Sequence, residues 1–366
     1  MFDFEYKYDS HEIHSIYPYP AKFPPTVPYQ LLKNFSKEGD TVFDPFCGSG
    51  TTLVEGLLYN CNVIGNDINP IALLISEIKI TNYNLEDFKI SDNYIDVLLH
   101  NYEIKKELIN PTYFKNIEHW FQENVRYELD LIKEIIYQID NNKIQKLWEL
   151  VFSNIIIEVS NQESDTRYAA INKNLKDGYT IELFIKKYFS TKNILLRWKF
   201  KESLKRRLYS EDSRNIISIK DNSVDIIITS PPYANTYDYY LYHKHRMNWL
   251  GFDVNKTKNA EIGSRNEFSS KKRPIEKWEE DIFLFTKEMK RVIKPEGHIC
   301  IVIGDSVVNK NFFDAYKAYK KIAVDLGLNL IYHTSVSLSK NTKKFNHKFR
   351  TKMDKKEHLI ILQKEK

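Results

Sequence analysis

The chain has 366 residues, of which 42% are hydrophobic and 28% charged, with a formal net charge of +5. This composition is typical of a soluble globular protein, and no apolar run reaches the ~20 residues that a membrane-spanning helix needs. The N-terminus lacks a basic segment followed by an apolar one, so we expect no signal peptide and a cytoplasmic location. The three cysteines, Cys47, Cys61 and Cys300, are too scattered for a disulfide framework or a paired-cysteine zinc site, and we expect no metal.

The first clear pattern in the chain is DTVFDPFCGSGTTLVEGLLYNCNVIGND. A short apolar run ends at Asp44, a turn containing Gly48 and Gly50 follows, and a helical pattern covers 51–59. A second apolar run then ends at Asp67. This order of strand, turn, helix and strand builds parallel sheets, so we predict an α/β fold.

The glycine turn has the chemistry of a ligand-binding loop. Gly48 and Gly50 let the backbone turn tightly beneath a ligand, and the amides of the following helix face that ligand. No lysine follows the glycines, which disfavours a nucleoside triphosphate, and Leu53 stands where a dinucleotide fingerprint has its third glycine. Asp67, at the end of the neighbouring strand, can accept both hydrogen bonds of a ribose diol. Together these residues predict a cofactor that contains a ribose.

Between about residues 80 and 214 glycine is rare, and stretches such as FQENVRYELDLIKEIIYQI carry apolar residues at spacings of three and four. This spacing predicts amphipathic helices, and we interpret the region as a helical insertion. One polar interruption, SNQESDTRYAAINKN at 160–174, is either a functional loop or an ordinary helix connection.

After residue 215 strands and helices alternate again. We predict one α/β domain interrupted by a helical module. The expected strands are NIISI, VDIIIT, EGHICIVIGD, LNLIYHTSVSLS and EHLIILQK, and the expected helices are YLYHKHRMNWLGF, EKWEEDIFLFTKEMKRVIK and FFDAYKAYKKIAVDLG. The polar segment 253–274 between the first two helices is either an active-site lid or a connector.

The tetrapeptide SPPY follows the apolar run VDIIIT directly. Ligands of such sheets bind outside the carboxyl ends of the strands. Pro231 and Pro232 stiffen this turn and withhold amide donors, which leaves the Pro231 carbonyl and the Ser230 hydroxyl as acceptors for an exocyclic amino group. Tyr233 can stack on the ring that bears this amine.

The motifs DPFCGSGTT and TSPPY resemble those of the amino-group DNA methyltransferases. The resemblance implies a Rossmann-like, doubly wound fold with a mainly parallel sheet and an antiparallel C-terminal strand. It implies S-adenosyl-L-methionine as the cofactor and the amine of a flipped-out DNA base as the methyl acceptor. The catalytic domain would comprise residues 1–80 and 215–366, and the helical insertion residues 81–214.

The resemblance also implies roles for single residues. The segment 19–40 resembles the family's helix near the methionine end of the cofactor, which adds Lys22. The segment ISIKDNSVDIIITSPPY resembles its join to the catalytic strand, where Asp221 would contact the adenine. The expected catalytic residues are Ser230, Pro231, Pro232 and Tyr233, and the expected cofactor-binding residues are Lys22, Asp44, Phe46, Gly48, Gly50, Thr51, Asp67 and Asp221.

Within this family a serine before the two prolines is typical of cytosine-N4 enzymes, so Ser230 favours cytosine over adenine-N6 methylation. Carbon-5 methylation needs a cysteine nucleophile, and none of the three cysteines is well placed for that role. Two alternatives stay open. One is an adenine-N6 or RNA methyltransferase on the same fold, and the other is a non-catalytic DNA-binding subunit.

Double-stranded DNA is the expected partner, with a cognate restriction endonuclease or a partner subunit as further candidates. The helical insertion is a candidate for reading DNA, for dimerisation or for binding a partner. The chain has three basic clusters, and the aromatic residues within two of them suit a polyanion that offers rings to stack on, the alternative being a solvated surface. The clusters are RWKFKESLKRR with Trp198 and Phe200, KKRP, and KNTKKFNHKFRTKMDKK with Phe345 and Phe349.

Overall fold

The computed structural model describes residues 11–22, 24–270, 273–309, 311–337 and 355–366. Its main sheet has seven strands among these residues, in the order β10-β11-β7-β6-β1-β2-β5. Every neighbouring pair is parallel except the two that involve β11, the C-terminal strand. The predicted α/β fold with a mainly parallel sheet and an antiparallel C-terminal strand is therefore confirmed. The strands are β1 (Thr41–Asp44), β2 (Asn62–Asn66), β5 (Arg206–Tyr209), β6 (Val224–Thr229), β7 (Ile293–Gly304), β10 (Leu328–Ser337) and β11 (Lys356–Lys364).

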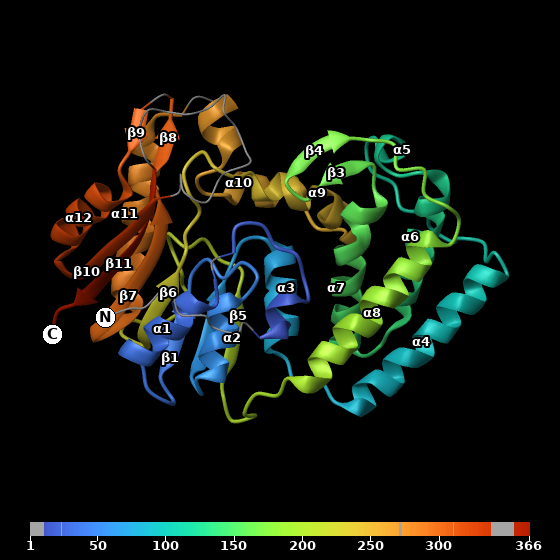
Figure 1. Ribbon diagram of the computed structural model, residues 1–366, viewed down its shortest axis with the longest axis horizontal. Coiled ribbons are helices and arrows are strands. Elements are labelled where there is room, and N and C mark those ends of the chain that lie inside the picture. The colour runs from blue at the N-terminus through green and yellow to red at the C-terminus, as the bar shows by residue number, and fades with distance from the viewer. Residues whose placement is uncertain (1–10, 23, 271–272, 310, 338–354) are drawn as a thin grey trace.

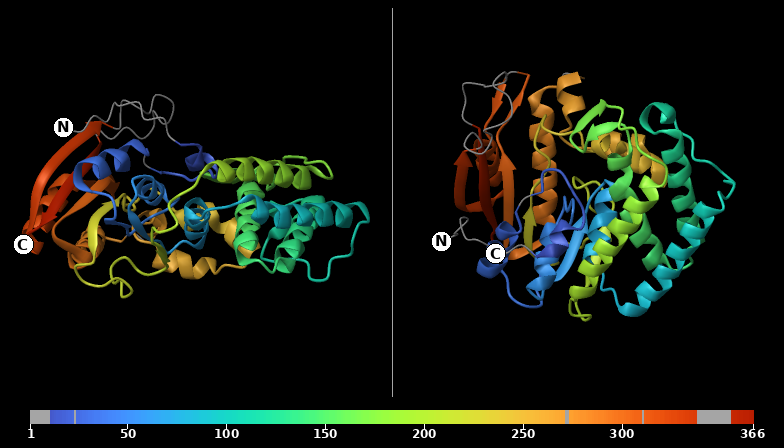
Figure 2. Two further views of the ribbon diagram at one scale, coloured as in Figure 1. Left: turned by 90° about the horizontal axis from the view of Figure 1, so that it is seen from below. Right: turned by 45° about the vertical axis from the view of Figure 1, so that its right-hand side comes forward.

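Helices cover both faces of the sheet, as Figures 1 and 2 show. Along β6, Ile226 and Ile228 contribute to a core shared with α1 and α2, whereas Ile227 contributes to a second core shared with α11 and α12. Successive side chains of a strand point to opposite faces, so all three isoleucines are fully buried. The helices of this part are α1 (Thr26–Phe35), α2 (Thr51–Leu58), α3 (Pro70–Ile80), α9 (Tyr239–Leu250), α10 (Val254–Ala260), α11 (Ile275–Val292) and α12 (Ala315–Leu326), with the short η1 (Glu12–Ser15) and η2 (Asn266–Ser270).

The predicted insertion forms a helical module beside the sheet (Figure 1). Its core is continuous with residues of α3 and α9, so the module packs directly on the part that contains the main sheet. Among the described residues, none of the helices combines the length and the hydrophobicity of a membrane span. The module consists of α4 (Leu85–Glu103), α5 (Ile117–Trp120), α6 (Glu123–Gln138), α7 (Asn142–Val159), the hairpin β3 (Gln162–Ser164) and β4 (Arg167–Ala170), and α8 (Tyr179–Arg197).

A buried arginine joins α9 to this module. The Arg246 side chain is only 1% exposed, and its Nε donates to the Ser153 carbonyl of α7 at 3.0 Å. Its terminal nitrogen pairs with Asp165, in the turn between β3 and β4. A buried guanidinium is tolerated only where acceptors surround it, so this contact fixes how α9 sits against the module.

The strand that we predicted at NIISI does not form. The Glu211 carboxylate accepts the amides of Ile217 and Ser218, and Glu288 accepts that of Ile216, so these donors bond side chains and not a neighbouring strand. The sheet position beside β2 belongs to β5, which lies inside the range 81–214 assigned to the insertion. The insertion therefore ends before β5, and the chain re-enters the sheet earlier than predicted.

Two other expectations in this region also change. The polar interruption 160–174 contains the hairpin β3–β4, and is not a plain loop. In the first basic cluster, Phe200 is buried against the Arg206 guanidinium and Trp198 packs on His11, so these rings are not free to stack on a polyanion. Much of the other two clusters, 271–272 and 340–354, lies outside the described residues.

Candidate active site

A pocket opens where the order of the strands reverses, at the carboxyl ends of β1, β2 and β6. It encloses about 850 Å³, which includes open space at its mouth. The glycine turn and the SPPY segment, far apart in the sequence, meet in this pocket. Of the predicted site residues, those that line it are Lys22, Phe46, Gly48, Thr51, Asp67, Ser230 and Pro232.

The glycine turn has a backbone shape that glycine adopts without strain and other residues do not. Gly50 precedes α2 with φ +75°, and its amide donates to the Cys47 carbonyl at 2.7 Å. A Cβ on Gly50 would lie 2.9 Å from Ser76 Oγ and 3.2 Å from Ser76 Cα. Only glycine fits here, because an L-residue meets both an unfavourable φ and a steric contact. Gly50 is therefore a structural residue of the turn, behind the pocket lining.

We expect Gly50→Ala to lower the free energy of unfolding by about 1–3 kcal/mol and to weaken ligand binding in the pocket. Denaturant titration measures the first effect. Gly39→Ala is the matched control, because Gly39 has φ +86° and nothing within 4 Å of the added Cβ. Equal losses in the two variants would show that the contact with Ser76 is unimportant.

Asp67, just beyond β2, is part of the pocket wall. Its two oxygens accept the amides of Gly48 and Asn69, each at 2.9 Å. A carboxylate offers about four lone pairs, so both oxygens can still accept hydroxyl groups from a ligand. Burial raises the pKa of Asp67 to about 6. This is the arrangement expected of a carboxylate that binds a ribose diol.

Asp44, in contrast, does not line the pocket. It is 1% exposed, and its Oδ1 accepts the Thr229 hydroxyl at 2.7 Å and the Phe46 amide at 3.1 Å. Burial raises the pKa of Asp44 to about 6. Because Thr229 is the last residue of β6, directly before Ser230, Asp44 links the glycine turn to the end of β6.

The SPPY turn follows β6 as predicted. Ser230 and Pro232 line the pocket, and Pro231 is buried. Neither proline has an amide hydrogen, so this turn presents acceptors without competing backbone donors.

Tyr233 lies beside the pocket and is not among the residues that line it. Its hydroxyl donates to Glu357 Oε1 on β11 at 2.8 Å. Its ring packs against Gly304, where an added Cβ would lie 2.8 Å from Tyr233 Cε2. No pattern in the sequence indicates a role for Glu357, because this contact joins residues 124 positions apart.

Within the polar segment 253–274, the described residues 253–270 form one wall of the pocket and bind the residues that follow the SPPY turn. The Asn235 amide donates to the Gly263 carbonyl at 3.0 Å, and the Asn266 amide donates to Asp238 Oδ1 at 2.7 Å. Thr257, Ala260, Glu261 and Ile262 line the pocket. The segment is thus neither a plain connector nor separate from the site.

Glu261 is a pocket residue that we did not predict. Its two oxygens accept the amides of Tyr239 and Tyr240, at 2.7 and 3.0 Å, and so cap the N-terminus of α9. Burial raises the pKa of Glu261 to about 8. An isolated acid in a polar segment carries no pattern that marks it as a ligand.

Two further unpredicted groups lie at the glycine turn. Lys79 of α3 is fully buried, and its Nζ donates to the Ser49 carbonyl at 3.0 Å. Burial lowers the pKa of Lys79 to about 7. The Ser49 hydroxyl, buried in the pocket wall, has no hydrogen-bond partner among the described residues and can therefore bond a ligand.

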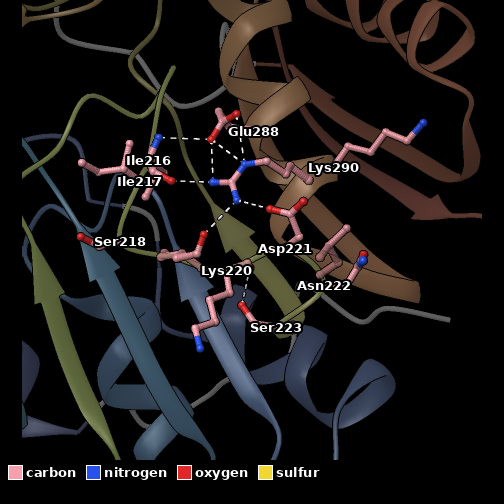
Figure 3. A network of polar contacts seen from close by, with 12 residues as sticks. Ile216, Ile217, Ser218, Lys220, Asp221, Asn222, Ser223, Glu288 and Lys290 are labelled. Carbon is pink, nitrogen blue, oxygen red and sulfur yellow. Dashed lines mark hydrogen bonds and ion pairs between the residues drawn. The ribbon is translucent and has the colours of Figure 1, made fainter.

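Asp221 does not line the pocket. It lies just before β6, at the opposite end of that strand from Ser230, and its carboxylate belongs to a polar network (Figure 3) in which it pairs with Arg291 at 2.6 Å. Its predicted contact with adenine assumed that a strand at 215–219 ended near it. Because β5 takes that place in the sheet, the residue at the pocket from this connection is Ser213.

A family model described as DNA methylase matches residues 2–77 and 224–366, which is more than half of the chain. The chain belongs to the DNA methylase family. The matched ranges contain both the glycine turn and the SPPY turn of the pocket, and they omit the helical module.

Among curated proteins, the methylase is 26% identical to the Type II methyltransferase M.MvaI of Kocuria varians, over 81% of this chain and 77% of that protein. It is 24% identical to M.MjaII of Methanocaldococcus jannaschii, over 87% of this chain and 75% of that protein. Among solved structures, it resembles a SAM-dependent methyltransferase from Methanosarcina mazei, with 11% identity, coverage of 92% of this chain and 97% of that chain, and a TM-score of 0.36.

The methyl donor of this family is S-adenosyl-L-methionine, and the pocket of the methylase fits its charge. The cofactor carries a sulfonium, an ammonium and a carboxylate, so its net charge is positive. Two carboxylates, of Asp67 and Glu261, and one ammonium, of Lys22, line the pocket. When both carboxyl groups are ionised the lining is net negative, so opposite net charges favour binding, and the free Ser49 hydroxyl adds a polar partner.

We expect the affinity of the methylase for S-adenosylmethionine to rise by about tenfold or more between about pH 5 and pH 9. The reason is that Asp67 and Glu261, with pKa values of about 6 and 8, must lose their protons to attract a cation. Calorimetry should therefore detect proton release on binding. Glu261→Gln is expected to remove the part of the rise near pH 8, and an unchanged profile would contradict the role of this carboxylate.

The ligand-free methylase should show the opposite dependence. Between the ordinary glutamate pKa of 4.5 and the folded value of about 8, the folded protein holds a proton on Glu261 that the unfolded chain has lost. Stability without cofactor is then lost as the pH rises through this window.

The three cysteines are all buried. Cys47 lines the pocket, but burial raises the pKa of its thiol well above the usual range, which disfavours the thiolate that a covalent attack requires.

Proposed function

We propose that this methylase transfers the methyl group of S-adenosylmethionine to the exocyclic N4 amine of a cytosine that is flipped out of a specific duplex DNA sequence. The observation that carries the proposal is Ser230 in the pocket wall, directly before Pro231 and Pro232. A serine at this position is typical of cytosine-N4 enzymes of the family that the chain resembles.

The chemistry requires acceptors at the SPPY turn. When bound, S-adenosylmethionine would supply an electrophilic methyl group, and the thioether of S-adenosylhomocysteine would be the leaving group. The Ser230 hydroxyl and the Pro231 carbonyl accept hydrogen bonds from the amine, which localises the nitrogen lone pair for this attack. After transfer the nitrogen loses one proton to solvent. Catalysis then rests on alignment of the two reactants and needs no covalent intermediate.

The cofactor would be held by the residues around the glycine turn. We assign Asp67 to the ribose diol, Phe46 to the adenine face, and Lys22 with Ser49 to the methionine carboxylate. All four line the pocket, and Phe46 is already oriented by an edge contact with Phe285 at 5.1 Å between ring centroids. Asp44 and Gly50 would act indirectly, by shaping the turn.

The context we propose is restriction and modification, because M.MvaI and M.MjaII are both named Type II methyltransferases. In such a system a nuclease with the same recognition sequence would be the cognate partner.

Mass spectrometry of nucleosides tests the proposed product. Plasmid DNA is incubated with the protein and S-adenosylmethionine that carries an isotopically labelled methyl group. Label in N4-methylcytosine is the expected result. Label in N6-methyladenine would contradict the choice of base and keep the mechanism. An absence of label in DNA, with cofactor binding intact, would contradict DNA as the substrate.

A further inference from the structure

The β3–β4 hairpin is a short antiparallel ribbon that projects from the helical module. Ser164 pairs with Arg167 across a turn formed by Asp165 and Thr166. At its base, the Ile171 amide donates to the Asn161 carbonyl at 2.7 Å. The exposed residues of the ribbon and of the start of the segment that follows it are Ser164, Thr166, Arg167, Ala170, Ile171 and Asn172.

The ribbon is anchored rigidly, and its anchor is the helix that leaves the active site. Asp165 pairs with the buried Arg246 of α9, and the Tyr168 ring stacks on His245 of the same helix with 5.3 Å between ring centroids. On the module side, the Asn161 amide donates to the Trp120 carbonyl at 2.7 Å. An exposed turn with such a base has a fixed position relative to the pocket.

The path from the pocket to the ribbon is short. Tyr239, at the start of α9, lines the pocket, and Arg246 follows seven residues later on the same helix. At 1.5 Å per residue the two Cα atoms are about 10 Å apart. The residue that anchors the ribbon on α9 is therefore about two helical turns from the pocket lining. Figure 1 shows β3–β4 and the small hairpin of β8 (Ser306–Val308) and β9 (Asn311–Phe313) at the same end of the molecule, on either side of α9 and α10.

The exposed side chains have the chemistry that reads base edges. The Arg167 side chain is 71% exposed, and Glu163 holds its guanidinium at 2.8 Å, so the group is oriented without being buried. Arginine matches the two acceptors of guanine in the major groove, and serine, threonine and asparagine bond base edges of either kind. Within the described part of the chain, no other residue buries these side chains, because all of them are exposed.

We infer that the β3–β4 hairpin enters the major groove of duplex DNA beside the flipped base and reads the recognition sequence with Arg167 and its exposed neighbours. The major groove admits a two-stranded ribbon, and the anchor on α9 couples the position of this ribbon to the pocket. The inference rests on the proposed function, because it requires DNA as the substrate. The inference gives the helical module a specific role, in which its helices support the ribbon.

Kinetics of a double variant, Thr166→Ala with Arg167→Ala, test the inference. We expect kcat/KM for DNA to fall by about tenfold to a hundredfold, while the Kd for S-adenosylmethionine and the thermal midpoint stay unchanged. The single variant Arg167→Lys should also have a reduced kcat/KM for DNA, because a lysine cannot make the bidentate contact with guanine. A hairpin that only braces α9 would instead shift cofactor binding or stability. Wild-type protein that methylates no DNA would contradict the proposed function, whereas equal DNA kinetics of wild type and variant would contradict this inference alone.

Thiol protection gives a second test that does not depend on turnover. The three native cysteines are buried, so Thr166→Cys introduces an accessible thiol at the ribbon tip. A DNA fragment that the wild-type protein methylates, added with S-adenosylhomocysteine, should slow maleimide labelling there by about tenfold. Val324→Cys on α12, where the side chain is 76% exposed, is the matched control and should label at the same rate with and without DNA. Unchanged labelling of Thr166→Cys would overturn the inference.

Discussion

Tyr233→Ala is expected to reduce methyl transfer by about tenfold to a hundredfold, with little change in the Kd for S-adenosylmethionine. Stacking of a base on an aromatic side chain contributes about 1–3 kcal/mol, and the variant loses it. The cofactor pocket should keep its shape, because Tyr233 is not one of the residues that line it. Single-turnover kinetics with labelled cofactor and calorimetric titration measure the two quantities separately.

Tyr233→Phe is the matched control for this prediction. The phenylalanine keeps the ring and its contact with Gly304, and loses only the hydrogen bond to Glu357. We expect a smaller loss of transfer, of about threefold to tenfold, since a hydrogen bond to a charged group contributes about 1.5–3 kcal/mol and here only orients the ring. If Tyr233→Ala weakened cofactor binding as much as transfer, the tyrosine would be a structural residue and not a base-stacking one.

Asp67→Ala is expected to weaken binding of S-adenosylmethionine by about a hundredfold or more. The carboxylate would accept two ribose hydroxyls, and each hydrogen bond to a charged group contributes about 1.5–3 kcal/mol. The alanine also releases the Gly48 amide, which Asp67 holds at 2.9 Å, so the glycine turn loses one of its contacts. Calorimetry gives the affinity, and denaturant titration shows whether the fold is intact.

Asp67→Asn separates these two effects. The amide oxygen can still accept the Gly48 amide, but the side chain has no charge and only one acceptor oxygen. We expect it to bind cofactor more tightly than Asp67→Ala and more weakly than the wild type. Cofactor binding that survives Asp67→Ala unchanged would show that the ribose assignment is wrong.

Several parts of the site could be predicted from the sequence because they are local. The order of strand, glycine turn, helix and strand around Asp44, Gly48 and Asp67 is a single continuous unit, and its parallel pairing is confirmed. The proline pair after the apolar run of β6 marks the end of a strand by itself. Carboxyl ends of parallel strands meet at one edge of a sheet, so a sequence that shows which residues follow each strand also shows which of them share a pocket.

Asp221 shows where this reasoning fails. The run NIISI has strand-like composition, but its amides bond Glu211 and Glu288, and the shorter, basic β5 pairs with β2 in its place. Because we predicted the wrong strand, we placed Asp221 at the pocket, whereas it lies at the opposite edge of the sheet. Strand pairing depends on which segment reaches the sheet edge, and local propensity is too weak to decide between two candidates.

The class of fold, the family motifs and the two turns that face each other across the pocket can all be predicted from the order of the residues. Three features follow from tertiary packing alone: Glu261 lines that pocket, Glu357 orients Tyr233, and Arg246 fixes the β3–β4 hairpin to α9. These contacts join residues far apart in the chain, in segments with no repeating pattern. Their partners are set by how the module, the sheet and the connecting segments pack, because a side chain finds its hydrogen-bond partner only after the backbone has brought the two together.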